Sequence, residues 1–334
     1  MTINVGINGF GRIGRCTLNH IAASGRNDIR VIKANATGPI ETAAHLLRYD
    51  SIHGRFAQDI RVGERTLDLG QGEIEMFSTY DPQELDWSGC DVVLECTGNF
   101  NDGQKAAVHL ERGAKSVLIS APAKNVQKTV VFGVNDEMLA KGDNMVSNGS
   151  CTTNCLAPLA KVLDEAFGIE HGIMTTIHSY TGDQPTLDRR HNDLYRARAA
   201  ALSMIPTTTG AAAAVGLVLP ELKGKLDGSA VRVPTPNVSC VDLKFVSRGK
   251  CTVEEVNKAM KKAASSGALK NVLGYSDEPL VSIDFNHNPN SSIFAANETA
   301  VTKGNLVRIL SWYDNEWGFS NRMCDTAVTM GKLI

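Results

Sequence analysis

A glycine-rich turn near the N-terminus constrains the fold of this chain more than any other feature. Residues 3–24 read as a short apolar strand, the turn Gly9-Phe10-Gly11-Arg12-Ile13-Gly14 and an amphipathic helix, and residues 29–35 read as a second strand. Glycines allow a tight turn and a close approach of the backbone to a pyrophosphate, and the helix N-terminus supplies amide donors. We therefore predict a dinucleotide site at this turn; a purely structural strand–helix turn is the alternative.

The remaining pattern divides the chain into two parts. Strands at 90–98 and 116–122, with helical periodicity between them, continue the alternation to about residue 150. Longer strands, a polar loop at about 180–205 and a helix after Thr252 follow. We predict an α/β protein: an N-terminal Rossmann-type doubly wound parallel sheet over 1–150, completed by a C-terminal helix at 317–334, and a C-terminal α+β catalytic domain with a mixed or antiparallel sheet over 151–316.

Composition excludes several classes of function. The chain has 334 residues, a formal net charge of -2 and 43% hydrophobic residues, so neither nucleic acid nor an acidic membrane is expected as the main partner. No signal peptide or apolar membrane span is visible. The eight cysteines form no CxxC pair, which favours a reducing, cytoplasmic location and argues against a bound metal.

One cysteine has the sequence context of a nucleophile. In SNGSCTTNC (147–155), Cys151 falls at the expected start of a helix, where the thiol pKa is lowered and the thiolate is favoured. We expect Cys155 and the other cysteines to be inert packing residues. Among eight histidines, His178 ends an apolar strand and is a candidate base, although a half-buried structural histidine is the alternative.

The motifs INGFGRIGR, YDSIHGRF, SNGSCTTNCLAPLAKVL, IPTTTGAA, RVPTPNVSCVDL and SWYDNEWGFSNR resemble phosphorylating glyceraldehyde-3-phosphate dehydrogenases over essentially the whole chain. The resemblance implies a homotetramer that reversibly oxidises D-glyceraldehyde 3-phosphate to 1,3-bisphosphoglycerate. Cys151 would form the hemithioacetal and thioester, with His178 as base. The related erythrose-4-phosphate dehydrogenases, and a binding protein on an old enzyme scaffold, are the alternatives.

The resemblance also implies the binding residues. Thr181 and Arg232 would bind the substrate phosphate. The attacking inorganic phosphate would be bound mainly by Ser150, Thr152, Arg198, Thr209 and Gly210. The cofactor would be bound by the turn glycines Gly9, Gly11 and Gly14 together with Arg12, Ile13, Asn35, Ala36, Thr37, Ser120 and Asn315, of which Asn315 would hold the nicotinamide amide.

The stretch VIKANATG (31–38) raises the question of which nicotinamide cofactor binds. An acid normally holds the adenosine ribose at this point, but residues 33–38 contain none, and Ala36 stands where NAD-using family members have Asp. Thr37 is a possible phosphate donor. The pair Arg189-Arg190, which family resemblance places beside a neighbouring subunit's adenosine, adds cations, with Lys33 a weaker candidate. We expect NADP to be preferred, with NAD also used; strict NAD use is the alternative.

Overall fold

The computed structural model describes all 334 residues, which form two compact units. Unit 1 comprises residues 1–150 and 320–334, and unit 2 comprises residues 151–319. The C-terminal helix α8 (Trp317–Gly331) begins in unit 2 and lies mostly in unit 1. No helix combines the length and the apolar character needed to cross a bilayer.

Unit 1 is built on a nine-stranded sheet in the order β10-β11-β9-β8-β1-β2-β7-β6-β5. Every pairing from β10 to β7 is parallel, and only the β7-β6-β5 edge is antiparallel. The strands are β1 (Ile3–Asn8), β2 (Ile29–Asn35), β5 (Arg61–Val62), β6 (Thr66–Asp68), β7 (Glu73–Phe77), β8 (Val92–Glu95), β9 (Ser116–Ile119), β10 (Lys128–Thr129) and β11 (Met145–Ser147). This confirms the predicted doubly wound sheet.

The centre of this sheet is buried on both faces, as expected for parallel strands covered by helices. In β1, Ile3, Val5 and Ile7 are fully buried, and β2 and β8 flank the strand on opposite sides. The chain adds strands first on one side of β1 and later on its other side. In α/β sheets such a reversal of strand order creates a crevice at the carboxyl ends of the strands, where ligands bind. The helices of this unit are α1 (Arg12–Ala23), α2 (Ile40–Arg48), α3 (Gly103–Ala106) and α4 (Val108–Glu111), and a small hairpin pairs β3 (Tyr49–Asp50) with β4 (Gly54–Arg55).

Unit 2 contains an eight-stranded mixed sheet in the order β13-β14-β12-β15-β19-β17-β16, with β18 also paired to β19. Most pairings are antiparallel, and β12–β14 and β16–β17 are parallel. The strands are β12 (Ile169–Ser179), β13 (Ile205–Thr208), β14 (Leu226–Val233), β15 (Ser239–Ser247), β16 (Leu273–Ser276), β17 (Ser292–Ala295), β18 (Ala300–Thr302) and β19 (Leu306–Tyr313). The predicted mixed sheet is confirmed.

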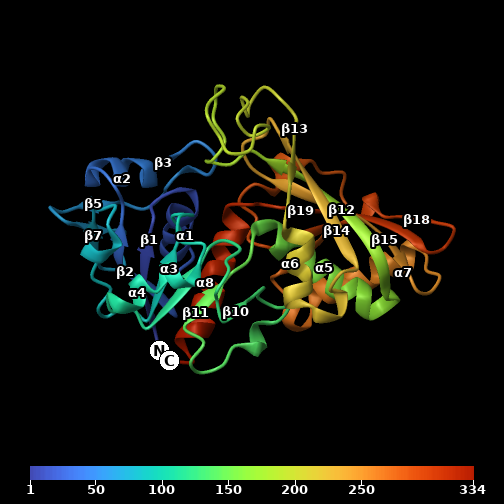
Figure 1. Cartoon of the computed structure of the whole chain (residues 1–334), viewed down its shortest axis with the longest axis horizontal. Helices are drawn as coiled ribbons and strands as arrows, with labels where there is room; N and C mark the ends of the chain where they lie inside the picture. The colour runs from blue at the N-terminus through green and yellow to red at the C-terminus, as the bar shows by residue number, and fades with distance from the viewer. The chain divides into compact units, whose positions relative to one another are not determined.

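Three helices accompany this sheet: α5 (Cys151–Phe167), α6 (Ala211–Val218) and α7 (Val253–Ser265), and α5 contacts both of the others (Figure 1). Thr252 caps α7 as predicted: its side chain accepts from the Glu255 amide while Glu255 accepts from the Thr252 amide. Between β12 and β13, residues 180–204 contain no helix or strand and form the yellow-green loops near β13 in Figure 1.

Alternation along β12 orients the side chains that matter for function. Met174, Thr176 and His178 are buried on one face, whereas Ile173 and Ile177 on the opposite face are exposed. Successive residues of a strand point to opposite faces of the sheet. His178 therefore lies on the face that also carries the buried Tyr313 of β19, whose ring packs edge-on against the imidazole.

Candidate active site

Unit 1 contains a hollow of about 390 Å³ at the carboxyl end of β1. Gly9 in this turn has a φ of 101°, a conformation that favours glycine. A Cβ on Gly14 would lie 2.0 Å from the Gly9 carbonyl oxygen, so glycine is required for the helix to approach the strand. Gly11 caps the N-terminus of α1, where unpaired amides attract an anion. The turn thus has the shape expected of a pyrophosphate cradle.

The lining of this hollow includes no carboxylate. Its residues are Asn8, Gly9, Phe10, Gly11, Asn35, Thr37, Thr79, Tyr80, Pro82, Leu85, Cys96, Thr97, Asn99 and Phe100. Asn35 uses its amide internally, donating to Asn8 Oδ1 at 2.9 Å and accepting from the Thr79 amide at 3.1 Å. Ala36 directly follows the last residue of β2, is 7% exposed and has no side chain that can bind a ribose hydroxyl. Thr37 is exposed on the rim.

The charged groups near this turn are mostly paired. Arg12 donates to Asp50 at 2.6 and 3.0 Å, and this guanidinium helps to lower the pKa of the Asp50 carboxyl to about 2 against the effect of burial. Lys33 contacts Asp86 at 2.7 Å and Glu75 at 3.7 Å, which makes it a poor candidate for binding a cofactor phosphate. Ser120 follows β9, and its amide donates to the Glu95 carbonyl at 3.0 Å.

A buried chain of hydrogen bonds supports the floor of the same hollow. Trp87 Nε1 donates to His109 Nδ1 at 3.1 Å, which places the His109 proton on Nε2, 2.9 Å from Glu95 Oε2. Glu95 also accepts from Asn8 Nδ2 at 2.6 Å. This connects three fully buried side chains to the asparagine that lines the hollow. Sequence reasoning missed these residues because nothing in their spacing indicates that they meet.

In unit 2, Cys151 is the first residue of α5 and lies beside His178. Its Sγ is 3.5 Å from Nε2 of the imidazole. All eight cysteines are free; six are buried, and only Cys96 and Cys151 are partly exposed. Cys155 is buried, 3.4 Å from Ser292 Oγ, as expected of a packing residue. The two residues predicted to perform the chemistry are therefore adjacent.

The surroundings of His178 assign its tautomer. Nδ1 lies 2.6 Å from the Ser179 carbonyl oxygen, a distance that requires a proton between them. Arg232 Nη1 is 3.0 Å from the same Nδ1, but its own protons are directed to the Ser179 carbonyl at 2.9 Å and to Thr181 Oγ1 at 3.1 Å. Nδ1 is thus the protonated nitrogen, and Nε2 presents its lone pair to the thiol.

Burial governs the ionisation of both groups. Burial and the positive charge of Arg232 lower the pKa of His178 to about 3, so the imidazole is neutral near pH 7. Burial raises the pKa of the Cys151 thiol, against the opposing effects of Arg232 and a hydrogen bond from Thr152. The sequence-based expectation of a lowered thiol pKa was wrong in direction, because desolvation outweighs the position of Cys151 at a helix N-terminus. The pair rests as a thiol and a neutral base.

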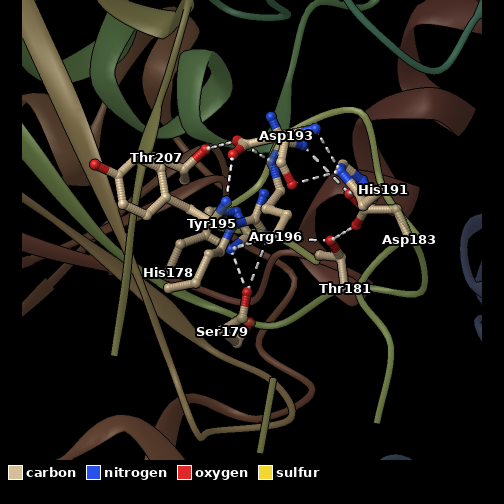
Figure 2. A network of polar contacts seen from close by, with 10 residues as sticks. His178, Ser179, Thr181, Asp183, His191, Asp193, Tyr195, Arg196 and Thr207 are labelled. Atoms are coloured by element: carbon tan, nitrogen blue, oxygen red, sulfur yellow. Dashed lines mark hydrogen bonds and ion pairs between the residues drawn. The ribbon is translucent and has the colours of Figure 1, made fainter. Parts of the chain in front are cut away.

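A network of polar groups links the loop after β12 with Thr207 of β13 (Figure 2). Thr181 accepts from Arg232 and donates to Asp183 at 2.5 Å. Arg196 then joins two acids, with Nη1 3.3 Å from Asp183 and Nε 3.1 Å from Asp193. Thr207 donates to Asp193 at 3.1 Å, and His191 lies 3.8 Å from Asp183. Two guanidiniums and two threonine hydroxyls are gathered here.

The other residues expected to bind inorganic phosphate are more dispersed. Arg198 pairs with Asp188 at 2.8 Å, is 67% exposed and takes no part in the network, whereas Arg196 does. The Thr152 hydroxyl is 2.9 Å from Tyr313 Oη, and Thr209 Oγ1 accepts from the Ala211 amide next to Gly210, the residue that caps α6. Ser150 directly precedes α5. The residues expected to bind inorganic phosphate therefore do not share one hydrogen-bond network within this chain.

Three further predicted cofactor residues are found in unit 2. Asn315 is buried, and its Oδ1 accepts from Ser179 Oγ at 2.7 Å and Ser239 Oγ at 2.9 Å, so two hydroxyls fix the orientation of its amide. Arg189 and Arg190 are both exposed, and neither guanidinium has an ion-pair partner within this chain. Their positions leave both cations available to a ligand or another subunit.

A glycine-cradled dinucleotide fold and a cysteine–histidine pair beside a guanidinium together define dehydrogenases that act through a cysteine nucleophile. Comparison with known proteins narrows this class. Residues 3–103 match the glyceraldehyde 3-phosphate dehydrogenase NAD binding domain, and residues 150–315 match the C-terminal domain of the same family.

Proteins named glyceraldehyde-3-phosphate dehydrogenase are similar over their full length. Those of Cereibacter sphaeroides and Xanthobacter flavus are each 62% identical, with 100% of both chains covered, and that of Geobacillus stearothermophilus is 55% identical over 98% of each chain. The chain belongs to the glyceraldehyde 3-phosphate dehydrogenase family.

Proposed function

We propose that this protein catalyses the reversible phosphorylating oxidation of D-glyceraldehyde 3-phosphate to 1,3-bisphosphoglycerate, with NADP preferred over NAD. The observation that carries the proposal is the arrangement around Cys151. Its thiol faces the unprotonated Nε2 of His178 at 3.5 Å, and Arg232 lies within 3.0 Å of the other ring nitrogen. A nucleophile, a neutral base and an anion-binding cation are thus present together.

The chemistry centres on Cys151. As Sγ attacks the aldehyde carbon, its proton passes to His178 Nε2, and the resulting imidazolium stabilises the oxyanion of the hemithioacetal. A bound nicotinamide cofactor supplies the hydride acceptor that allows oxidation to the thioester. Inorganic phosphate then attacks the thioester carbonyl, the C–S bond breaks and the acyl phosphate leaves. The departing Cys151 thiolate takes back the proton held on His178 Nε2, which restores the thiol and the neutral base. Nδ1 keeps its proton throughout and donates it in a hydrogen bond to the Ser179 carbonyl oxygen, which holds the ring in place.

Two anion sites serve this reaction. Arg232 and Thr181 share a hydrogen bond and lie next to His178, which suits them to the phosphate of the aldehyde. For inorganic phosphate we propose Arg198, together with Thr209 and Gly210 and the residues Ser150 and Thr152 that flank the nucleophile. Arg198 is exposed and has a single acid partner, Asp188, whereas Arg196 is held by both Asp183 and Asp193 and, like Lys33, is the poorer candidate.

The residues of unit 1 fit a nicotinamide dinucleotide. Gly9 and Gly14 leave room where a Cβ would intrude, and Gly11 caps the N-terminus of α1. Arg12, Ile13 and Ser120 adjoin this turn or the neighbouring strand end. Asn315 would hold the nicotinamide amide. The preference for NADP is supported by Ala36, because a carboxylate at that position would repel a 2′-phosphate, and by the unpaired Arg189 and Arg190.

The exposed apolar residues favour an oligomer, and we propose the homotetramer implied by the family. Ile173 and Ile177 are exposed on the outward face of β12, and Leu187, Leu194, Leu202 and Met204 are exposed in the loop that follows. Exposed apolar residues gathered on one sheet face and its adjoining loop are typical of subunit contacts. Light scattering of the purified protein measures the mass directly, and a monomer would exclude this assembly.

Initial rates test the activity. We expect glyceraldehyde 3-phosphate with phosphate and NADP to give the highest kcat/KM, exceeding that with NAD by about tenfold. Erythrose 4-phosphate as the better aldehyde would instead assign the chain to the related erythrose enzymes. Cys151→Ser should abolish turnover, whereas the matched control Cys155→Ser, which alters a buried packing thiol in the same helix, should retain it.

A further inference from the structure

A second hollow, of about 330 Å³, lies beside the first in unit 1. Its lining comprises Ala36, Gly38, Ile40, Glu64, Arg65, Met76, Phe77 and Ser78. Thr37 and Thr79 line the first hollow, and their sequence neighbours line the second, so the two share the segments 36–38 and 77–79 as a wall. A group attached to the ribose at the end of β2 would therefore stand at the boundary of the second hollow.

Backbone hydrogen bonds fix the position of this hollow relative to Ala36. The Ala36 amide donates to the Phe77 carbonyl at 2.9 Å, and the Met76 amide donates to the Arg65 carbonyl at 2.9 Å. Ser78 Oγ closes the loop after β2 by accepting from the Gly38 amide at 3.0 Å and donating to its carbonyl at 3.1 Å. The backbone of Arg65 is thus held in position relative to the end of β2 by hydrogen bonds that run through strand β7.

The lining of this hollow includes one cation, Arg65, and one anion, Glu64. Arg65 is exposed and makes no hydrogen bond or ion pair with its guanidinium in this chain, in contrast to Arg12 and Lys33, which both bind carboxylates. Glu64, also exposed, is the opposing group and lines the same hollow without an ion pair. A planar guanidinium with all its donors free suits a phosphate dianion.

We propose that Arg65 is a specificity-determining residue that binds the 2′-phosphate of NADP in the second hollow, a role that rests on the proposed function. Because Ala36 carries no carboxylate, nothing at that position repels the 2′-phosphate, and Gly38 places no side chain in the hollow. Arg65, from the β5–β6 hairpin of the same chain, supplies the positive charge that attracts the phosphate. The carboxylate of Glu64, in the same hollow, repels the 2′-phosphate and limits the preference for NADP. Arg189 and Arg190 would act independently, from another subunit.

The test is titration calorimetry on the assembled protein with NADP, NAD, adenosine 2′,5′-bisphosphate and AMP as ligands. We expect Arg65→Gln to weaken binding of NADP and of the bisphosphate by about tenfold while leaving NAD and AMP unchanged. Arg65→Lys should retain part of the affinity, and Glu64→Gln should strengthen NADP binding. Arg61→Gln, which changes an exposed arginine on the same hairpin, is the matched control.

The outcomes separate this proposal from the proposed function. An unchanged NADP affinity in Arg65→Gln, or equal losses of affinity for NADP and NAD, would overturn the role of Arg65. If the wild type still prefers NADP in that case, the cofactor assignment remains intact. If the wild type prefers NAD, the cofactor assignment fails, and Arg65 is then judged by the bisphosphate against AMP alone. A selective loss for the bisphosphate supports it, and no selective loss rejects it.

Discussion

Nε2 of His178 lies 3.5 Å from Sγ of Cys151, while the opposite ring nitrogen is held 2.6 Å from the carbonyl oxygen of Ser179. The carbonyl can only accept, so it commits Nδ1 to carrying the proton and leaves Nε2 as the base. The geometry does not depend on a carboxylate partner for the histidine. A backbone carbonyl at the end of β12 orients the ring instead.

Replacing His178 tests this assignment. We expect His178→Asn to lower kcat/KM for glyceraldehyde 3-phosphate by 10²–10⁴-fold, since a positioned base contributes about that much. Alkylation of Cys151 by iodoacetamide should slow as well, because the thiol loses its proton acceptor. His171→Asn, on the exposed face of the same strand, is the control and should leave both rates unchanged. Equal turnover in the wild type and His178→Asn would remove His178 from the mechanism.

The fold could be predicted from the sequence because the patterns that define it are local. The glycine turn, the alternation of β12 and the capping residue Thr252 each involve residues close together in the chain, so their patterns could be read directly. Cys151 and His178 were predicted as nucleophile and base on a different ground, because their motifs resemble those of a family, and the structure places the two side chains 3.5 Å apart.

What the sequence could not supply depends on contacts between distant residues. The raised pKa of Cys151 reflects burial, which no local pattern reports. How far Arg196 and Arg198 are free to bind phosphate depends on which acids each one meets in a loop without regular structure. Arg65 lies on a hairpin 30 residues from the strand end that it serves and is brought there only by the pairing of β2 with β7.

Arg232 is expected to act on both substrate binding and the base. Arg232→Gln should raise KM for glyceraldehyde 3-phosphate about tenfold or more, because a charge-assisted contact to phosphate is lost. The same change should raise the pKa of His178, since the nearby positive charge now lowers it. Kinetics and a pH titration of the histidine by nitrogen NMR measure the two effects. Unphosphorylated glyceraldehyde is the control substrate, and an equal loss with both aldehydes would contradict phosphate recognition.

Arg196 and Arg198 form a matched pair for the inorganic phosphate site. Arg196 is held by Asp183 and Asp193 in the network next to Thr181, whereas Arg198 is exposed and bound to Asp188. We expect Arg198→Gln to raise KM for phosphate by about tenfold to hundredfold and Arg196→Gln to change it less than twofold. Rates measured over a range of phosphate concentrations decide the matter. The reverse order would assign phosphate binding to Arg196 instead.

The Arg12–Asp50 pair predicts a defined dependence of stability on pH. The pKa of Asp50 is about 2 in the folded protein, below its usual value near 3.8, so the folded state favours the carboxylate. The stabilisation is therefore complete above about pH 4 and is lost as the pH falls towards 2. By linkage it amounts to about 2 kcal/mol. Asp50→Asn should lower the free energy of unfolding by that amount at pH 7 and by much less near pH 2, as measured by urea denaturation at each pH. The control Asp59→Asn changes an exposed acid and should have the free energy of unfolding of the wild type at both pH values. If Asp50→Asn lowers the free energy of unfolding by the same amount at every pH, packing rather than charge accounts for the contribution of Asp50.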